Sequence, residues 1–102
     1  MAITSKQRSQ LRGMAAAEDT IIHVGKGGIN DNLIESVNTA LKARELVKGK
    51  VLENSMFTAR EACDALAEAC KAEPVQVIGT KFVLYKRNEK EPKIVLVKDK
   101  KK

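Results

Sequence analysis

The chain has 102 residues, of which 43% are hydrophobic and 31% charged, a size and composition that suit one domain with a modest core. It contains no apolar run near the roughly 20 residues of a membrane span, and its charged start lacks the apolar stretch of a signal peptide, so we expect a cytoplasmic protein without membrane contact. The net charge of +6 favours a polyanion as partner, although a lysine tail on an ordinary soluble protein would give the same total.

The excess positive charge lies at the two ends of the chain. Residues 1–13 carry three cations and no acid, residues 98–102 carry four lysines and one acid, and residues 14–97 sum to zero. The cations of the first segment are Lys6, Arg8 and Arg12. We expect one domain over residues 1–97 and a disordered basic tail over residues 98–102.

The first expected elements are a helix and a strand. Thr4 and Gln7 stand at the N-cap and N3 positions of a capping box, and Leu11 belongs to the apolar stripe of the helix that follows. The acidic pair at 18–19 ends this helix. The β-branched residues between Thr20 and Val24 then predict a strand.

A glycine-rich loop follows this strand, with the sequence Val24-Gly25-Lys26-Gly27-Gly28-Ile29. Asn30 is a good N-cap for the next helix, whose apolar residues recur at helical spacing from Leu33 to Leu41. Glycine allows positive φ and close approach of a ligand, and a helix N-terminus offers free N–H groups and a positive dipole end. With Lys26 at its tip, the loop favours a phosphate.

The second half of the chain predicts a strand, a helix and a hairpin. The expected ranges are Leu46–Leu52 for the strand, Ser55–Ala72 for the helix, Val75–Ile78 and Phe82–Tyr85 for the hairpin strands, and Ile94–Val97 for a short edge strand. Gly49 interrupts the valine face of the first of these strands and marks a bulge or a close approach. Thr58 with Glu61 fits a second capping box, and Gly79-Thr80 suits a type II′ hairpin turn.

The expected element order is α-β-α-β-α-β-β. Helices between the first three strands suggest crossover connections and hence parallel pairs, and the hairpin adds an antiparallel pair. The sequence therefore predicts an α/β sandwich around a small mixed four-stranded sheet.

Cysteine and histidine give no sign of a metal site or of catalysis. Cys63 and Cys70 fall on one helix with Cα atoms roughly 10 Å apart, beyond the roughly 7 Å reach of a disulfide, so we expect two small buried hydrophobes. His23 is the single histidine, without a cysteine or carboxylate at a suggestive spacing, and we expect it to be partly buried and structural. We therefore expect that the protein is not an enzyme and that it holds no metal and no cofactor.

The residues beside the glycine loop weaken the nucleotide-binding alternatives. Lys26 is followed by Gly27 rather than by the Ser or Thr of a Walker P-loop, and Asn30 replaces the third glycine of a dinucleotide fingerprint. KH domains clamp nucleic-acid backbone with a Gly-x-x-Gly loop, but there the loop joins two helices, whereas here it follows a strand. A tight turn without any ligand stays open as an alternative.

Several short motifs along residues 3–97 match one family in order and spacing. They are Lys6-Gln7-Arg8 with Leu11-Arg12, the glycine loop, Leu46-Val47-Lys48, Val75-Gln76-Val77-Ile78-Gly79 and Leu84-Tyr85-Lys86-Arg87. On these residues the chain resembles the CRM domain (chloroplast RNA splicing and ribosome maturation) in its stand-alone bacterial form, the YhbY-like proteins. The resemblance implies a fold similar to the C-terminal domain of translation initiation factor three. It also implies RNA binding, with ribosomal RNA of large-subunit precursors as the partner of the bacterial members.

Two positions depart from the family pattern. Gly49 stands where the family usually has a branched apolar residue, which puts the packing of that strand in doubt. Asn30 stands where Thr or Ser is common, and it caps a helix equally well. The lysine tail lies outside the resemblance.

We expect RNA phosphates to approach the loop at Gly25, Gly27 and Gly28, with Lys26 as their partner. The basic residues of the first helix would lie beside the loop, and cations of the second strand and the hairpin are further candidates. This candidate set comprises Lys6, Arg8, Arg12, Lys48, Lys50, Lys86 and Arg87.

The aromatic residues limit how RNA could be recognised. The chain has two Phe, one Tyr and no Trp, too few for a sheet that stacks bases, so recognition should depend on backbone and shape. We expect a monomer that assists assembly of the large ribosomal subunit. The alternative is a protein-interaction module that docks on ribosomal proteins or assembly factors, with RNA contact incidental.

Overall fold

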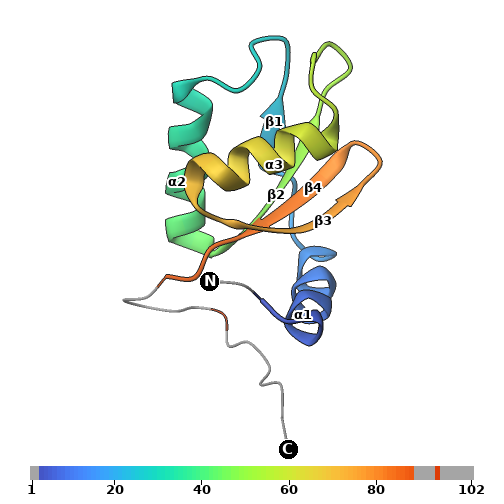
Figure 1. The fold of residues 1–102 in the computed structure, drawn as a ribbon, viewed down its shortest axis with the longest axis vertical. Coiled ribbons are helices and arrows are strands. Elements are labelled where there is room, and N and C mark those ends of the chain that lie inside the picture. Colours follow the sequence, from blue (N-terminus) through green and yellow to red (C-terminus); the bar gives the residue numbers. More distant parts are fainter. Residues whose placement is uncertain (1–2, 89–93, 95–102) are drawn as a thin grey trace, which may run out of the picture.

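A four-stranded mixed sheet with helices on both faces forms the body of the protein (Figure 1). The computed structural model describes residues 3–88 and residue 94. In chain order the elements are α1 (Ser5–Ala15), β1 (Ile22–Val24), α2 (Asp31–Arg44), β2 (Leu46–Val51), α3 (Ala59–Cys70), β3 (Glu73–Ile78) and β4 (Lys81–Tyr85). This order confirms the predicted α/β fold class. Within the described ranges, no helix has the length and apolar character needed to cross a membrane.

The strands lie in the order β1-β2-β4-β3. β1 pairs with β2 in parallel, whereas β4 pairs antiparallel with both β2 and β3. The predicted parallel pairing of the second and third strands is wrong, because the hairpin folds back and places β4 between them. The hairpin itself is confirmed: Ile78 pairs with Lys81 across a two-residue turn in which Gly79 has φ 59°.

Strand alternation divides the core between the two faces of the sheet. α2 and α3 pack on one face, where Val37, Leu41 and Leu66 meet Phe82 and Leu84. α1 packs on the other face against apolar side chains of the last three strands. The buried cluster there comprises Ile3, Leu11, Ala15, Leu46, Val75, Val83 and Tyr85. Figure 1 shows that α1 lies at the end of the sheet opposite to the loop between β1 and α2.

Side-chain caps fix where the helices begin. Thr4 and Gln7 exchange two hydrogen bonds of 3.0 and 3.1 Å at the start of α1, and Thr58 and Glu61 form the same reciprocal pair at α3. Asn30 caps α2 through its side-chain oxygen. The three predicted caps are confirmed. The third helix begins at residue 59, later than expected, because the capping residue before it has an extended backbone.

Gly49 of β2 lies directly opposite Phe82 of β4. A Cβ atom at Gly49 would stand 2.4 Å from Cζ of Phe82, whose side chain is only 1% exposed. The ring therefore occupies the space that a branched residue at position 49 would need. Of the two predicted alternatives at this glycine, the close approach is confirmed.

A buried carboxylate ties the chain after β4 to the end of α2. Glu45 is fully buried and adopts φ 66°, and its carbonyl accepts the N–H of Lys86 at 2.9 Å. Its carboxylate oxygens accept the N–H groups of Asn88 and Ile94, each at 2.8 Å. Of the expected edge strand over residues 94–97, only Ile94 is described and it lies outside any strand, while the basic tail lies outside the described residues.

Both cysteines are buried and free, as predicted. Burial raises the pKa of the Cys63 thiol from 9.0 to about 11, and the neighbouring Asp64 adds to the shift while Arg60 opposes it. Burial also raises the pKa of Tyr85, and Glu45 adds to that shift. Both groups therefore stay neutral in the folded protein to a higher pH than they would in water.

Replacing Gly49 by Ala is expected to destabilise the protein by roughly 1–3 kcal/mol, because the new methyl group collides with the Phe82 ring. Gly13→Ala is the matched control. Gly13 lies inside α1 with nothing within 4 Å of its Cβ position, so alanine there should stabilise by up to about 1 kcal/mol. Urea unfolding of both variants measures the difference. Equal effects at the two glycines would contradict the packing described for β2.

Folding stability is expected to fall as the pH rises from 9 towards 11. The Cys63 thiol ionises at a lower pH in the unfolded chain than in the folded protein. The free energy of unfolding therefore falls across this interval, by about 2–3 kcal/mol from this thiol alone. Chemical denaturation across this range measures the slope. Cys63→Ala, whatever its own cost, should show a shallower slope than the wild type, and identical slopes would count against the buried thiol as the cause.

Candidate nucleic-acid interface

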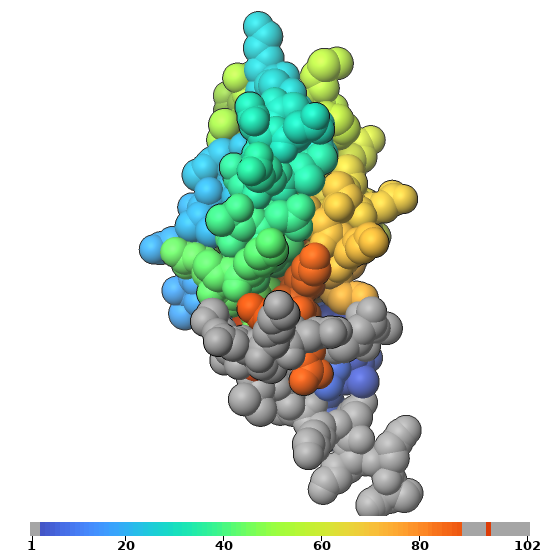
Figure 2. Space-filling view, turned by 90° about the vertical axis from the view of Figure 1, so that its left-hand side faces the viewer, coloured from blue at the N-terminus to red at the C-terminus, as the bar shows by residue number. Residues whose placement is uncertain are grey.

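The glycine loop forms a tight turn at one end of the sheet. The N–H of Gly28 donates to the carbonyl of Gly25 at 3.0 Å, which closes a four-residue turn with Lys26 and Gly27 at its centre. Lys26 is exposed at the tip. Figure 2 shows this loop projecting beyond the body of the molecule, in line with the start of α2.

The fold accounts for one of the three glycines. Gly28 has φ 71°, and a Cβ there would lie 3.2 Å from the ring of Phe57. A Cβ at Gly25 would meet Leu52 Cδ1 at 3.4 Å, which is an ordinary van der Waals contact. At Gly27 a Cβ would meet only the Asn30 side chain, at an ordinary 3.7 Å. The fold therefore has no need of glycine at position 27, which leaves a close-approaching ligand as a reason for it.

The sheet face that carries α1 is covered over only part of its area. In the pairing register, one row across all four strands consists of His23, Lys50, Lys81 and Ile78. The next row crosses three strands and consists of Lys48, Val83 and Gln76. We call these two rows, apart from the buried Val83, the open sheet face. Its charged side chains are cations, and neither row contains an acid.

A cleft of about 340 Å³ lies where α1 meets the open sheet face. Its polar lining comes from Arg12 of α1 together with Lys48, Gln76 and Lys81 of the sheet, and the apolar lining includes Ile78 and Val83. Three cations from three elements therefore surround one concave surface. An anion there would face no carboxylate among the lining residues.

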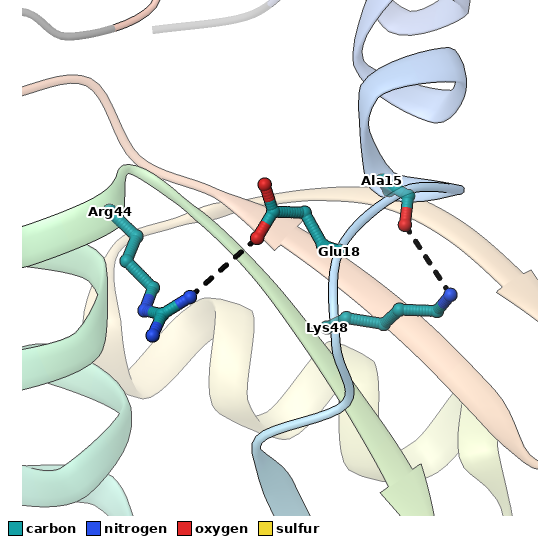
Figure 3. A network of polar contacts seen from close by, with 4 residues as sticks. All are labelled: Ala15, Glu18, Arg44 and Lys48. Atoms are coloured by element: carbon teal, nitrogen blue, oxygen red, sulfur yellow. Dashed lines mark hydrogen bonds and ion pairs between the residues drawn. The ribbon is translucent and has the colours of Figure 1, made fainter.

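Two polar contacts join the end of α1 and the segment after it to β2 and α2 (Figure 3). Lys48 Nζ donates to the carbonyl of Ala15 at 3.3 Å, at the C-terminal end of α1, where a cation is favourable. Arg44 Nη1 lies 3.6 Å from Glu18 Oε1, an exposed pair worth at most about 1 kcal/mol. Lys48 is thus partly engaged with α1, whereas the side chains of Lys50 and Lys81 make no hydrogen bond or ion pair with the described part of the chain.

The structure brings together only part of the predicted residue set. Arg12, Lys48 and Lys50 lie on or beside the open sheet face. Arg8 is half-buried and its guanidinium donates to the carbonyl of Pro74, so it joins α1 to β3. The expectation that the basic residues of α1 lie beside the glycine loop is wrong, because α1 and the loop occupy opposite ends of the sheet (Figure 1).

The remaining predicted cations lie elsewhere. Lys6 is exposed in the first turn of α1. Lys86 and Arg87 follow β4 beyond the pairing of Tyr85 with Leu46, at the end of the sheet away from the glycine loop. They do not join the open sheet face.

Sequence reasoning missed Lys81, Gln76 and the position of His23. Lys81 precedes Val83 and Tyr85 by two and four residues, so strand alternation alone could have placed it on the α1 face. The predicted partial burial of His23 is wrong: its side chain is exposed, because β1 is an edge strand and His23 points to the open sheet face. Within the described ranges, no group of His, Cys, Asp and Glu could hold a metal ion.

Comparison with known proteins gives a consistent result. Residues 3–86 match the model of the CRS1 / YhbY (CRM) domain. The chain is 40% identical over 94 residues to the "Probable RNA-binding protein YqeI" of Bacillus subtilis (strain 168), covering 92% of this chain and 98% of that protein. It is 34% identical to the "Probable RNA-binding protein MJ0652" of Methanocaldococcus jannaschii, covering 98% of this chain and 75% of that protein.

A solved structure shares the fold. The solution structure of the hypothetical protein SAV1595 from Staphylococcus aureus, named as a candidate RNA-binding protein, superposes with a TM-score of 0.78 at 40% identity. The match covers 94% of this chain and 100% of that chain.

Gly28→Ala is expected to destabilise the protein by about 1–2 kcal/mol, because alanine must adopt a left-handed backbone beside the Phe57 ring. Gly27→Ala should change the free energy of unfolding by no more than about 0.5 kcal/mol. Thermal or urea unfolding distinguishes the two. A similar loss at both glycines would mean that the fold requires the whole loop, and Gly27 would then carry no information about a ligand.

Proposed function

Because this chain belongs to the CRS1 / YhbY (CRM) domain family, we propose that it binds RNA, chiefly through the phosphate backbone. The observation that carries the proposal is the open sheet face, where Lys48, Lys50 and Lys81 lie in adjacent rows with Arg12 at the rim and no acid between them. Cations held by neighbouring strands match a polymer of regularly spaced negative charges. The named relatives are described as RNA-binding proteins, which supports the same partner.

The glycine loop extends this surface past the end of the sheet. His23 and Lys50 form the row next to the end from which the loop leaves, so Lys26 continues the line of cations. Gly27 lets a phosphate approach the backbone beside Lys26. The start of α2 contributes less, because Asn30 already accepts the N–H of Leu33 and Asp31 places a negative charge in the first turn.

RNA recognition in this arrangement depends on backbone and shape. Phe82 and Tyr85 are each only 1% exposed, so the sheet has no aromatic surface on which bases could stack in the RRM manner. Five cations contribute: Arg12, Lys26, Lys48, Lys50 and Lys81. Neutralising five phosphates predicts a slope of about −4 for the logarithm of the association constant against the logarithm of the salt concentration.

We further propose that the RNA is ribosomal, in precursors of the large subunit, and that the protein assists assembly of that subunit as a binding protein without a catalytic step. The support for this finer proposal is the family resemblance. Crosslinking in cells, followed by sequencing of the bound RNA, tests which class of RNA the protein binds. Recovery of mainly messenger RNA would contradict it.

Lys26→Glu is expected to weaken binding to large-subunit precursor RNA about tenfold at low salt, and the double change Lys50→Glu with Lys81→Glu by about a hundredfold. Both variants should flatten the salt slope. Lys42→Glu is the matched control, since it makes the same charge change in the last turn of α2, in the layer behind the sheet. Filter binding over a salt series measures all of them.

The result also separates RNA binding from a protein-docking role. If the fold of each variant is intact but its RNA affinity equals that of the wild type, the open sheet face does not bind RNA. The alternative, docking on ribosomal proteins or assembly factors, would then account better for the exposed cations.

A further inference from the structure

A second cleft opens at the end of the sheet, beside the glycine loop. It has a volume of about 700 Å³ and lies between the β2–α3 loop (residues 52–58) and the β3–β4 turn (residues 79–80). Apolar lining comes from Leu52 and Phe57, and polar lining from Glu53, Thr58 and Thr80. Lys50 of the open sheet face also lines it.

The cleft borders both of the proposed phosphate contacts. Lys50 belongs both to the cleft and to the sheet row that it shares with Lys81. On the other side, Leu52 approaches the Cβ position of Gly25 to 3.4 Å, and the N–H of Leu52 donates to the carbonyl of Val24 at 2.8 Å. Figures 1 and 2 both show the β1–α2 and β2–α3 loops projecting at the same end of the molecule. A strand of RNA that runs from Lys81 and Lys50 towards the glycine loop therefore passes beside this cleft.

Apolar side chains are exposed along the same loop. Leu52, which lines the cleft, is 37% exposed, and the loop also carries the half-buried Phe57 of the cleft and the 89% exposed Met56, which lies outside the cleft lining. Leucine side chains pack well against the flat faces of nucleobases, and the ring of Phe57 offers a surface for stacking.

The polar lining suits the edge of a base better than it suits a phosphate. Glu53 carries a negative charge at the cleft and would repel a phosphate, whereas its oxygens can accept hydrogen bonds from the amino and imino groups of a base. The hydroxyl groups of Thr58 and Thr80 can donate or accept. The cleft thus combines apolar walls for the face of a base with polar groups for its edge.

We propose that this cleft receives one unpaired nucleobase of the bound RNA. The inference rests on the RNA binding proposed above, and it adds that the target contains an unpaired nucleotide rather than continuous duplex. The phosphates on either side of the extruded base lie on Lys50 and near Lys26. Paired bases cannot enter the cleft, because their edges are engaged with the opposite strand.

A matched pair of synthetic RNAs tests the proposal with the intact protein. Both are stems with one bulged nucleotide, and they differ only in that the bulged ribose carries guanine in one and no base in the other. The phosphates are identical, so phosphate contacts alone predict equal affinity. We expect the RNA with the base to bind about tenfold more tightly. Equal affinity for the two RNAs would overturn the proposal and assign the cleft to another occupant, such as a peptide.

Two variants separate this inference from the proposed function. Leu52→Ala should remove most of the difference between the two RNAs, while the abasic stem should still bind through the cations. Lys50→Glu with Lys81→Glu should weaken both RNAs. A Leu52→Ala variant that keeps the full difference would overturn the base cleft and leave phosphate binding standing, whereas failure of the wild type to bind either stem at low salt would remove the proposed RNA binding itself.

Discussion

The arrangement of the whole surface depends on how far α1 extends over the sheet. The helix has 11 residues, a length of about 16 Å, and it covers the end of the face where Leu46, Val75 and Tyr85 lie. Beyond the helix, the β2 residues that point to this face change from apolar to basic, from Leu46 to Lys48 and Lys50. β4 changes in the same way, from Tyr85 and Val83 to Lys81. The cations therefore begin where the cover ends, and the short helix creates both the second core and the exposed basic surface.

The glycine loop and the open sheet face are parts of one surface because they share an end of the sheet. The loop leaves β1 directly after the row that contains His23 and Lys50. Its glycines serve two purposes: Gly28 allows a left-handed backbone close to Phe57, whereas Gly27 leaves the tip open. The β2–α3 loop projects at the same end of the molecule (Figure 2). Its Leu52 lies against Gly25, and it carries exposed apolar side chains of its own. One end of the molecule thus combines charge, an open backbone and apolar contact area.

Local features of the sequence were sufficient to predict the elements but not their arrangement on the surface. Capping boxes at Thr4 and Thr58, and the turn at Gly79, are decided by residues close in sequence, and all were predicted. The end of the sheet at which α1 packs depends on contacts of Leu11 and Ala15 with strands far along the chain. Because α1 packs at that end, its basic residues lie away from the glycine loop. The row that joins Lys50 to Lys81 depends on strand register, which no local pattern reveals.

The central claim is that RNA lies on the open sheet face and the glycine loop. Titration of the isotopically labelled protein with large-subunit precursor RNA, followed by backbone amide NMR, tests it most directly. The account predicts that the largest shift changes fall on residues 25–28 and on Lys48, Lys50 and Lys81, and that they disappear as salt is raised. Shift changes concentrated on the exposed side of α2 and α3, with the sheet residues unperturbed, would contradict it.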